Sequence, residues 1–254
     1  MYYTKDFKEL CKKVIKKQGE DKTCFLSFST GKDSVATFLR CLETGLFDKF
    51  VLFYYFLIPE MSWIDEYLDY FEKKFGVEII RVPNPAFYRM MSEGLLQTPV
   101  GIKALDKLYL DNNGFVRFEY KDIMNMIKEK MQLSNKLLCA VGIRSGDSMM
   151  RKMVIEKHGL IIEKQGKWYP IHDFSFEDIR NIYKKHDVKY IEDYELFGLT
   201  FDGLDYRFLK VIKDKKPEDY QRIKKWFPLI DLMIYRHEHY FGTKLKKSRF
   251  NYNK

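Results

Sequence analysis

The sequence predicts an α/β protein with an open, mainly parallel sheet that carries helices on both faces. Short β-favouring runs alternate with segments in which apolar residues recur at helical spacing. Strands separated by helices of about a dozen residues are joined by βαβ crossovers, which produce parallel sheets. The expected strands are residues 23–28, 50–57, 77–82 and 137–141.

The expected helices follow these strands or lie between them, at residues 33–42, 63–71, 119–131 and 175–186. The second of them ends near Gly76, a residue type that suits a helix terminus. The last has an amphipathic pattern, so its apolar residues are expected to face the core: Phe176, Ile179, Ile182 and Tyr183.

The domain organisation that we expect is one α/β nucleotide-binding domain followed by a helical extension packed on it. The first covers residues 1–190, and the second covers the aromatic-rich residues 191–254. The extension ends in a basic tail that contains Lys244, Lys246, Lys247 and Arg249. Neither an internal repeat nor a low-complexity linker interrupts the sequence.

The charge balance points to an anionic partner. Lys and Arg number 45 against 36 Asp and Glu, which gives a formal net charge of +9. Nucleotide phosphates or a nucleic acid would suit this excess. The alternative is a lysine-rich solvated surface, because basic and acidic residues are interspersed along most of the chain.

Several classes of protein are disfavoured. The sequence contains no apolar run near the roughly 18–20 residues that a membrane span needs, and its N-terminus is polar. We therefore expect a cytoplasmic protein without a membrane partner. The cysteines form no CxxC pair, which fits reduced thiols better than disulfides or zinc: Cys11, Cys24, Cys41 and Cys139. The sequence predicts no oligomeric state.

The segment from Ser27 to Ser34 carries the main chemical signal. It lies between an expected strand and helix, where open parallel sheets bind ligands. The helix presents unpaired N–H groups and a positive dipole end, which together hold phosphate oxygens. Gly31 allows close approach of the backbone, and Lys32 adds a cation. Hydroxyl groups of Ser29, Thr30 and Ser34 are further donors.

This segment differs from a Walker A loop. Leu26 stands where that pattern needs glycine, and Asp33 separates Lys32 from Ser34. An acidic residue beside phosphates is repelled by them unless a cation intervenes, so Asp33 suggests Mg²⁺ carried by the nucleotide. The alternative is an ordinary N-cap made by Ser29, Asp33 or Ser34.

Residues Ser29 to Ser34 resemble the PP-loop, S-G-G-x-D-S, of the adenine nucleotide alpha hydrolase-like superfamily, in particular its phosphoadenosine phosphosulfate (PAPS) reductase branch. The resemblance implies that ATP is cut between its α and β phosphates, with adenylation of a substrate and release of pyrophosphate. By the same resemblance, Asp33 serves Mg²⁺–pyrophosphate, and the neighbouring residues of the loop, with Ser27, hold the nucleotide. Thr30 stands where this family usually has glycine.

A second stretch, Gly142 to Ser148 followed by Arg151, resembles the G-I-R-x-x-E-S-x-x-R region of that branch. There the arginines contact the nucleotide or the substrate's charged groups. The guanidinium groups of Arg144 and Arg151 would provide a forked grip on phosphate or carboxylate. The resemblance places Gly142, Asp147 and Ser148 among the nucleotide-binding residues, with Asp147 in place of a glutamate. The alternative is that both arginines form surface ion pairs.

The reaction within this branch depends on the thiols. Reduction of a sulfated nucleotide needs a cysteine thiolate, and in the reductases this cysteine lies in a mobile C-terminal segment. This sequence has no cysteine after Cys139. What remains is adenylation by a transferase or ligase that uses ATP and Mg²⁺, with a base in nucleic acid or a small molecule as acceptor. Its expected catalytic residues are Lys32, Asp33, Arg144 and Arg151. Two alternatives stay open: a PAPS reductase-like sulfonucleotide enzyme, and a non-catalytic nucleotide- or nucleic-acid-binding module.

Three further features are weaker signals. His172 with Asp173 is expected at a strand end, where a structural histidine is favoured over a substrate contact. Glu60 follows the second expected strand and is a candidate for binding ribose. His237 and His239 are two residues apart, so on a helix they point to different faces and are not expected to chelate one metal ion.

Overall fold

The structure is a computed structural model that describes residues 7–103 and 119–240. The basic tail predicted from Lys244 to Arg249 lies outside the described residues. The chain divides into two compact units. Unit 1 contains Met1–Tyr55, Leu68–Val82 and Met124–Tyr190, and unit 2 contains Phe56–Tyr67, Pro83–Ile123 and Ile191–Lys254. The domain boundary expected after residue 190 stays a prediction.

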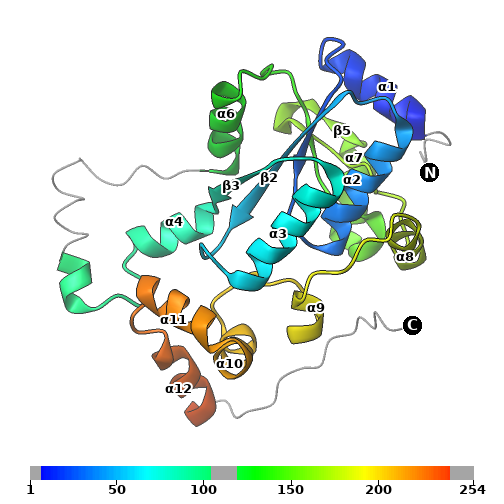
Figure 1. Ribbon diagram of the computed structural model, residues 1–254. Helices are drawn as coiled ribbons and strands as arrows, with labels where there is room; N and C mark the ends of the chain where they lie inside the picture. The colour runs from blue at the N-terminus through cyan, green and yellow to red at the C-terminus, as the bar shows by residue number, and fades with distance from the viewer. Residues whose placement is uncertain (1–6, 104–118, 241–254) are drawn as a thin grey trace. The chain divides into compact units, whose positions relative to one another are not determined.

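The described part of unit 1 is organised around a sheet with the strand order β3-β2-β1-β4-β6-β5 (Figure 1). Its strands are β1 (Thr23–Ser27), β2 (Lys49–Phe56), β3 (Ile79–Pro83), β4 (Cys139–Ala140), β5 (Ile161–Ile162) and β6 (Lys167–Trp168). Strand β1 pairs in parallel with β2 and β4, and β4 pairs in parallel with β6. Strand β5, at the edge, pairs antiparallel with β6. The mainly parallel sheet is therefore confirmed, and the β5–β6 hairpin is an addition to the prediction.

Strand β1 occupies the position that decides where a ligand can bind. Its register places Leu26 beside Leu52 of β2 on one side and Ala140 of β4 on the other. The next strand in the sequence, β2, pairs with one edge of β1, and the later strand β4 pairs with its other edge. Such a reversal of strand order opens a crevice at the carboxyl ends of the strands. The loops that follow β1 and β4 both start at this reversal.

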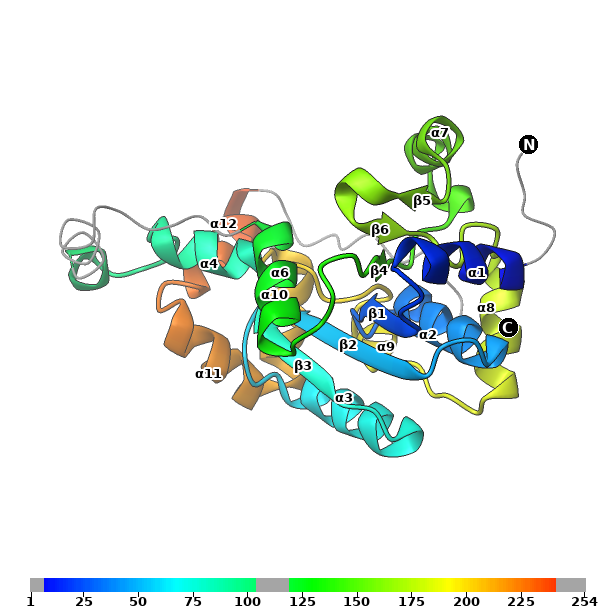
Figure 2. The same ribbon diagram turned by 90° about the horizontal axis from the view of Figure 1, so that it is seen from above.

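Helices cover both faces of the sheet, as predicted. Figure 2 shows α2 (Lys32–Thr44) and α3 (Ser62–Phe75) on one face and α6 (Tyr120–Lys130) on the other. Phe38 of α2 packs against Phe71 and Phe75 of α3, with ring centroids 5.1 and 5.0 Å apart. Helix α3 ends at Gly76, whose φ of 63° is in the left-handed region that glycine tolerates best.

The described part of unit 1 also contains α1 (Phe7–Lys17), α7 (Met149–His158) and α8 (Phe176–Lys185). In α8 the predicted inward residues Ile179, Ile182 and Tyr183 are buried. The prediction for Phe176 is wrong, because this side chain is 48% exposed. Phe176 is the first residue of its helix and lies against charged side chains rather than in the apolar core.

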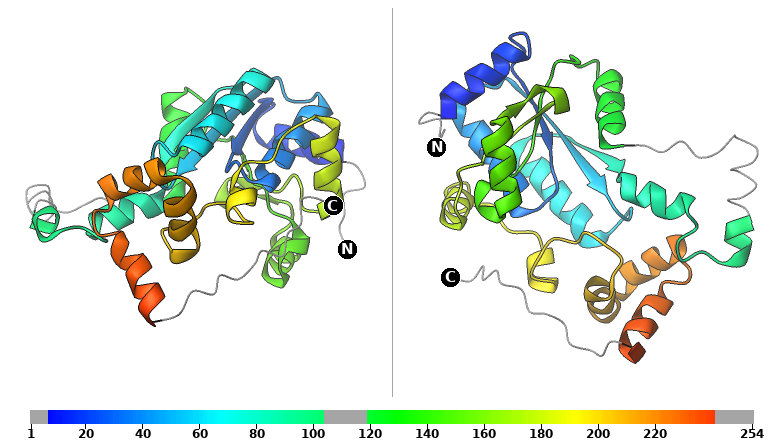
Figure 3. Two further views of the ribbon diagram at one scale, coloured as in Figure 1. Left: turned by 60° about the horizontal axis from the view of Figure 1, so that its bottom comes forward. Right: turned by 180° about the vertical axis from the view of Figure 1, so that it is seen from behind.

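The described part of unit 2 is mainly helical. It contains α4 (Pro85–Ser92), α9 (Asp193–Leu196), α10 (Tyr206–Lys215), α11 (Pro217–Trp226) and α12 (Asp231–Tyr240). Both views in Figure 3 show the last three as neighbouring orange to red helices. Asp231 of α12 accepts hydrogen bonds from Lys213 of α10 at 2.9 Å and from Lys224 of α11 at 2.7 Å. These charge-assisted contacts connect the three helices.

The unit 2 helices also hold the segment 56–67. Asp219 of α11 accepts hydrogen bonds from the backbone N–H and the hydroxyl of Ser62 at 3.0 and 2.6 Å. Asp193 accepts from Trp63 Nε1 at 2.5 Å and from the backbone N–H of Phe201 at 2.7 Å. Burial raises the pKa of Asp193 to about 6. Within the described residues, every helix is too short or too polar to cross a lipid bilayer.

Candidate functional site

The loop between β1 and α2 folds around the hydroxyl of Ser34. Ser34 Oγ accepts a hydrogen bond from the backbone N–H of Ser29 at 3.1 Å and donates one to the carbonyl of Gly31 at 2.9 Å. Gly31 is the N-cap of α2, and no side chain caps this helix. The alternative that Ser29, Asp33 or Ser34 forms an ordinary N-cap is therefore wrong. The start of α2 keeps the N–H groups and the positive dipole end that suit an anion.

Thr30 adopts a conformation that explains the glycine in the family pattern. Its φ is 60°, in the left-handed region where β-branched residues are rare. The side chain is 2% exposed, and its hydroxyl donates to the carbonyl of Ser29 at 2.5 Å. The Thr30 hydroxyl, which was expected to donate a hydrogen bond to phosphate, thus donates to a carbonyl of its own loop. Ser27, also expected to bind nucleotide, is the last residue of β1.

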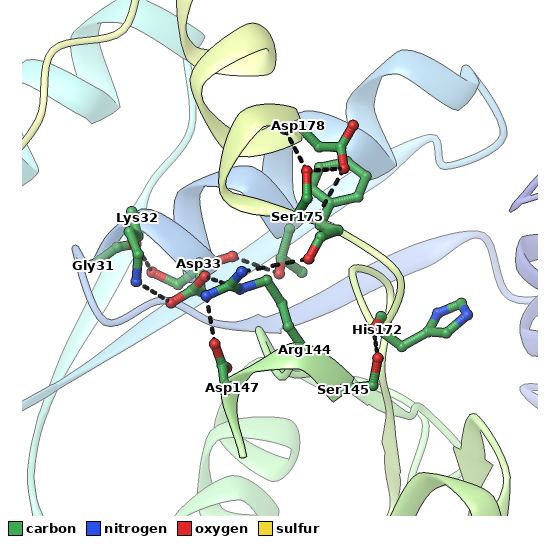
Figure 4. A network of polar contacts seen from close by, with 12 residues as sticks. Gly31, Lys32, Asp33, Arg144, Ser145, Asp147, His172, Ser175 and Asp178 are labelled. Atoms are coloured by element: carbon green, nitrogen blue, oxygen red, sulfur yellow. Dashed lines mark hydrogen bonds and ion pairs between the residues drawn. The ribbon is translucent and has the colours of Figure 1, made fainter. Parts of the chain in front are cut away.

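A continuous chain of alternating charges connects the two predicted loops (Figure 4). Lys32 Nζ lies 2.8 Å from Asp33 Oδ2, and Arg144 Nε lies 2.8 Å from Asp33 Oδ1. Asp147 in turn pairs with Nη2 of Arg144 and with Nη1 of Arg151. The structure therefore brings together all the side chains that the sequence predicted to be catalytic. Asp147, which the resemblance placed among the nucleotide-binding residues, bridges the two arginines.

The two arginines differ in exposure. The side chain of Arg144 is 3% exposed and that of Arg151 is 48% exposed. The alternative that both form surface ion pairs is thus wrong for Arg144. Each donor group of the Arg144 guanidinium has an acceptor, because Nη1 also donates to the carbonyl of Phe174 at 3.4 Å. Arg144 connects the two loops, whereas the side chain of Arg151 is half exposed and contacts Asp147.

Gly142 allows the second loop to approach the first. A Cβ atom at this position would lie 2.8 Å from the carbonyl carbon and oxygen of Asp33 and 3.0 Å from the backbone nitrogen of Ser34. Real Cβ atoms essentially never come this close to backbone atoms. The missing side chain of Gly142 thus lets the arginine loop pack against the start of α2, where Arg144 contacts Asp33. The predicted role of Gly142 in nucleotide binding stays a prediction. Ser148 caps α7, since its side chain accepts from the N–H of Arg151 at 3.2 Å.

The segment before α8 supports the arginine loop. The carbonyl of His172 accepts from the N–H of Ser145 at 2.9 Å and from its hydroxyl at 2.7 Å. The His172 ring is buried, and this burial lowers its pKa. Asp173 pairs with Arg40 of α2, with Nη2 to Oδ2 at 3.1 Å. Burial opposes the ionisation of Asp173, but the hydrogen bond and charge of Arg40 outweigh it and lower its pKa.

Sequence reasoning missed one residue of this site. The ring of Phe176 lies under the Arg144 guanidinium carbon, with 4.3 Å to the ring centroid, and Lys32 Nζ is 5.5 Å from the same centroid. Both distances fall within the range of cation–π interactions. The helical pattern assigned Phe176 to the core, and no spacing in the sequence indicates that it contacts two cations.

Two weaker candidates, Glu60 and His237, belong to unit 2. Glu60, the ribose candidate, has a φ of 61°. His237 stacks on Tyr206 with ring centroids 3.8 Å apart. Throughout residues 7–103 and 119–240, no group of three or more His, Cys, Asp or Glu side chains could hold a metal ion.

The cysteines are all buried: Cys11, Cys24, Cys41 and Cys139. Cys139 lies on β4, close to the arginine loop in sequence, and burial raises the pKa of its thiol to about 12. Burial also raises the pKa of Cys41 well above its usual value. Both thiols therefore stay protonated at neutral pH, which makes them poor nucleophiles.

Solved structures with similar folds include two enzymes. An NH3-dependent NAD synthetase from Campylobacter jejuni, in complex with nitrate, is 12% identical at a TM-score of 0.41, and the alignment covers 95% of this chain and 98% of that chain. The U34-tRNA thiolase NcsA from Methanococcus maripaludis, with its iron–sulfur cluster, is 15% identical at a TM-score of 0.40, with 96% and 90% covered. No curated protein matches this chain.

A family model matches residues 23–197, which is more than half of the chain. The matched region begins with β1 and includes the loop before α2, the arginine loop and the segment that leads into α8. This match confirms the resemblance indicated by Ser29 to Ser34 and by Gly142 to Arg151. The chain belongs to the phosphoadenosine phosphosulfate reductase domain family.

Proposed function

We propose that this protein binds ATP at the loop from Ser27 to Ser34 and cleaves its α–β bond to adenylate a substrate. The observation that carries the proposal is the charge chain from Lys32 through Asp33 and Arg144 to Arg151. It starts at the N-terminus of α2 and joins two strand-end loops on either side of the reversal in strand order. This is where doubly wound sheets bind nucleotides.

Phosphate groups would be held by elements that are already in place. The N-terminus of α2 offers backbone N–H groups and a partial positive charge, with the Ser29 hydroxyl beside them. Lys32 is a mobile cation on a four-carbon stem, which can turn from Asp33 toward phosphate oxygens. Arg151, with a half-exposed guanidinium, suits an α-phosphate or an acceptor carboxylate.

The fit of Mg²⁺ depends on Asp33. Both of its carboxylate oxygens already have a partner: Oδ2 pairs with Lys32 Nζ and Oδ1 with Arg144 Nε, each at 2.8 Å. An ion that depended on protein ligands alone would find no sufficient set of donors here. An ion bound mainly by nucleotide phosphates and water needs only one or two protein contacts, and Asp33 can supply one when Lys32 moves to the phosphates. The residues thus fit Mg²⁺ that arrives with ATP, where it would neutralise phosphate charge.

The proposed reaction has two steps. A carbonyl or carboxylate oxygen of the acceptor attacks the α-phosphorus, and the bond from this phosphorus to the bridging oxygen breaks. Pyrophosphate leaves with the bonding electrons. An amine or thiol nucleophile then displaces AMP from the activated acceptor. In both steps the protein contributes positioning and charge stabilisation, which dominate catalysis of phosphoryl-type transfer. The acceptor that we propose is a base in nucleic acid or a small molecule.

The state of the thiols supports adenylation over reduction of a sulfonucleotide. A reductase needs a thiolate that can reach the sulfur atom. All four cysteines of this sequence are buried, and burial raises the pKa of the Cys139 thiol to about 12. A thiol in that state would be a very slow nucleophile at neutral pH.

The decisive experiment incubates the protein with α-labelled ATP, Mg²⁺ and a mixture of candidate acceptors. We expect labelled AMP and pyrophosphate, and ADP with phosphate would contradict the proposal. Sulfite release from PAPS with a thiol reductant would favour the reductase, and tight ATP binding without any product would favour a binding module. Asp33→Asn should abolish turnover and leave the fold intact. Asp48→Asn, at a carboxylate that is 72% exposed and paired with Lys22 at 3.6 Å, is the matched control.

A further inference from the structure

Phe176 departs from the pattern of its own helix. The other apolar residues of α8 that were expected to face inward are buried, whereas the Phe176 side chain is 48% exposed. The exposed ring leaves apolar surface in water. It does not lie alone at the surface, because two cations of the site lie against it.

The positively charged groups of Arg144 and Lys32 both lie close to the Phe176 ring. The guanidinium carbon of Arg144 lies 4.3 Å from the ring centroid, and Nζ of Lys32 lies 5.5 Å from it. Both cations also contact the single carboxylate of Asp33. Arg144 has a second carboxylate partner in Asp147, and the negative face of the ring adds attraction for both cations.

The ring also completes the restraint on Arg144. Hydrogen bonds to Asp33, Asp147 and the carbonyl of Phe174 hold the guanidinium within its plane. These contacts are all made at the edge of the guanidinium group. Phe176 lies against one face of the group and adds a restraint perpendicular to its plane. Arg144 therefore keeps its Nε–H directed at Asp33.

The backbone fixes the ring in turn. Ser175 and Asp178 form a capping box at the start of α8, in which Ser175 Oγ accepts from the Asp178 N–H at 3.1 Å and Asp178 Oδ2 accepts from the Ser175 N–H at 2.7 Å. Figure 4 shows this pair beside the Arg144–Asp33 contact. Phe176 is the residue directly after the cap, so its position is set by the first turn of the helix.

We infer that Phe176 is a positioning residue, an aromatic platform that orients Arg144 and holds Lys32 near the site when Lys32 exchanges Asp33 for phosphate. The part that concerns Lys32 rests on the proposed function, because it requires nucleotide. The part that concerns Arg144 applies to the protein without ligand. The two parts can therefore be tested separately.

The first test needs no nucleotide. It measures the hydrogen exchange of the Arg144 Nε proton by NMR in the wild type, in Phe176→Leu and in a protein with pentafluorophenylalanine at position 176. Leucine keeps apolar contact, and pentafluorophenylalanine keeps the size of the ring but reverses its quadrupole. Both changes should speed exchange at least about threefold, since a cation–π contact of ordinary strength accounts for roughly that factor. Unchanged exchange in both proteins would overturn the inference.

The second test measures the affinity for α,β-methylene-ATP with Mg²⁺ by calorimetry. We expect a loss of about threefold to tenfold in Phe176→Leu and in the pentafluoro protein, and a change of less than about twofold in Phe176→Tyr. A purely steric role would spare the pentafluoro protein and would contradict the inference. If the wild type does not bind the analogue, the proposed function fails. In that case, hydrogen exchange of the Arg144 Nε proton still tests whether Phe176 orients Arg144.

Discussion

Replacing Gly142 by alanine tests the contact between the two loops most severely. The new Cβ would lie 2.8 Å from the carbonyl carbon and oxygen of Asp33, where ordinary contact starts at 3.4 Å. These are backbone atoms at the start of α2, so they cannot swing aside as the end of a long side chain can. The strand-end loop must move instead, and it carries Arg144 two residues later.

The size of the effect follows from this geometry. Forcing an extra carbon into a packed region costs about 1–3 kcal/mol, which in a chain of this size lowers the melting temperature by about 2–10 °C. The Arg144–Asp33 hydrogen bond at 2.8 Å would lengthen, and a hydrogen bond of this kind weakens steeply when its geometry is lost. A charge-assisted bond is worth about 1.5–3 kcal/mol, so ATP affinity should fall at least about tenfold.

A matched control lies in the same loop. A Cβ atom at Gly146 would have no atom within 4 Å, so Gly146→Ala should change stability by less than about 0.5 kcal/mol. Differential scanning calorimetry measures the melting temperature of both variants, and titration calorimetry measures the affinity for α,β-methylene-ATP. Equal melting temperatures and equal affinities for the two alanine variants would refute the argument that the loops depend on the missing side chain.

Three further predictions concern the rest of the molecule. Burial raises the pKa of Asp193 from 3.8 to about 6, so its contribution to stability is complete below pH 4 and is lost as the pH rises through 6. Urea unfolding should show the wild type losing up to about 3 kcal/mol relative to Asp193→Asn between pH 4 and pH 7, and a constant difference would contradict this. Iodoacetamide at pH 8 should modify none of the four buried cysteines in the native protein and all four in urea, as read by mass spectrometry; rapid labelling of Cys139 would refute its raised pKa. Thr30→Gly should change the free energy of unfolding by less than about 1 kcal/mol, because relief of the left-handed backbone offsets the lost hydrogen bond. Thr30→Val keeps the strain and loses that bond, so it should be clearly less stable.

The central part of the fold could be predicted because its signals are local. Strand β1 is a short buried apolar run that ends in a hydroxyl-rich turn, and Gly76 ends its helix in the conformation that glycine favours. Helix α7 was not predicted, since it has no buried residue and hence no amphipathic stripe. Strands β5 and β6 contain two residues each, which is too short for any periodicity.

The site was predictable in its residue types but not in its connections. The chemistry of the loop and the resemblance to family motifs singled out Lys32, Asp33, Arg144 and Arg151, and their side chains are connected in the structure. Their catalytic roles stay predictions. That Asp147 bridges the two arginines depends on three-dimensional placement, which spacing alone does not reveal. Phe176 was assigned to the core because a helical pattern records only which residues are apolar.

The most direct test of the account is a crystal structure of the protein with α,β-methylene-ATP and Mg²⁺. We expect the phosphates at the start of α2, with Lys32 Nζ moved from Asp33 to a phosphate oxygen and Arg144 still bound to Asp33. An analogue bound at another place on the protein, with the Lys32–Asp33 pair unchanged at 2.8 Å, would contradict the claim that this loop holds the triphosphate of ATP.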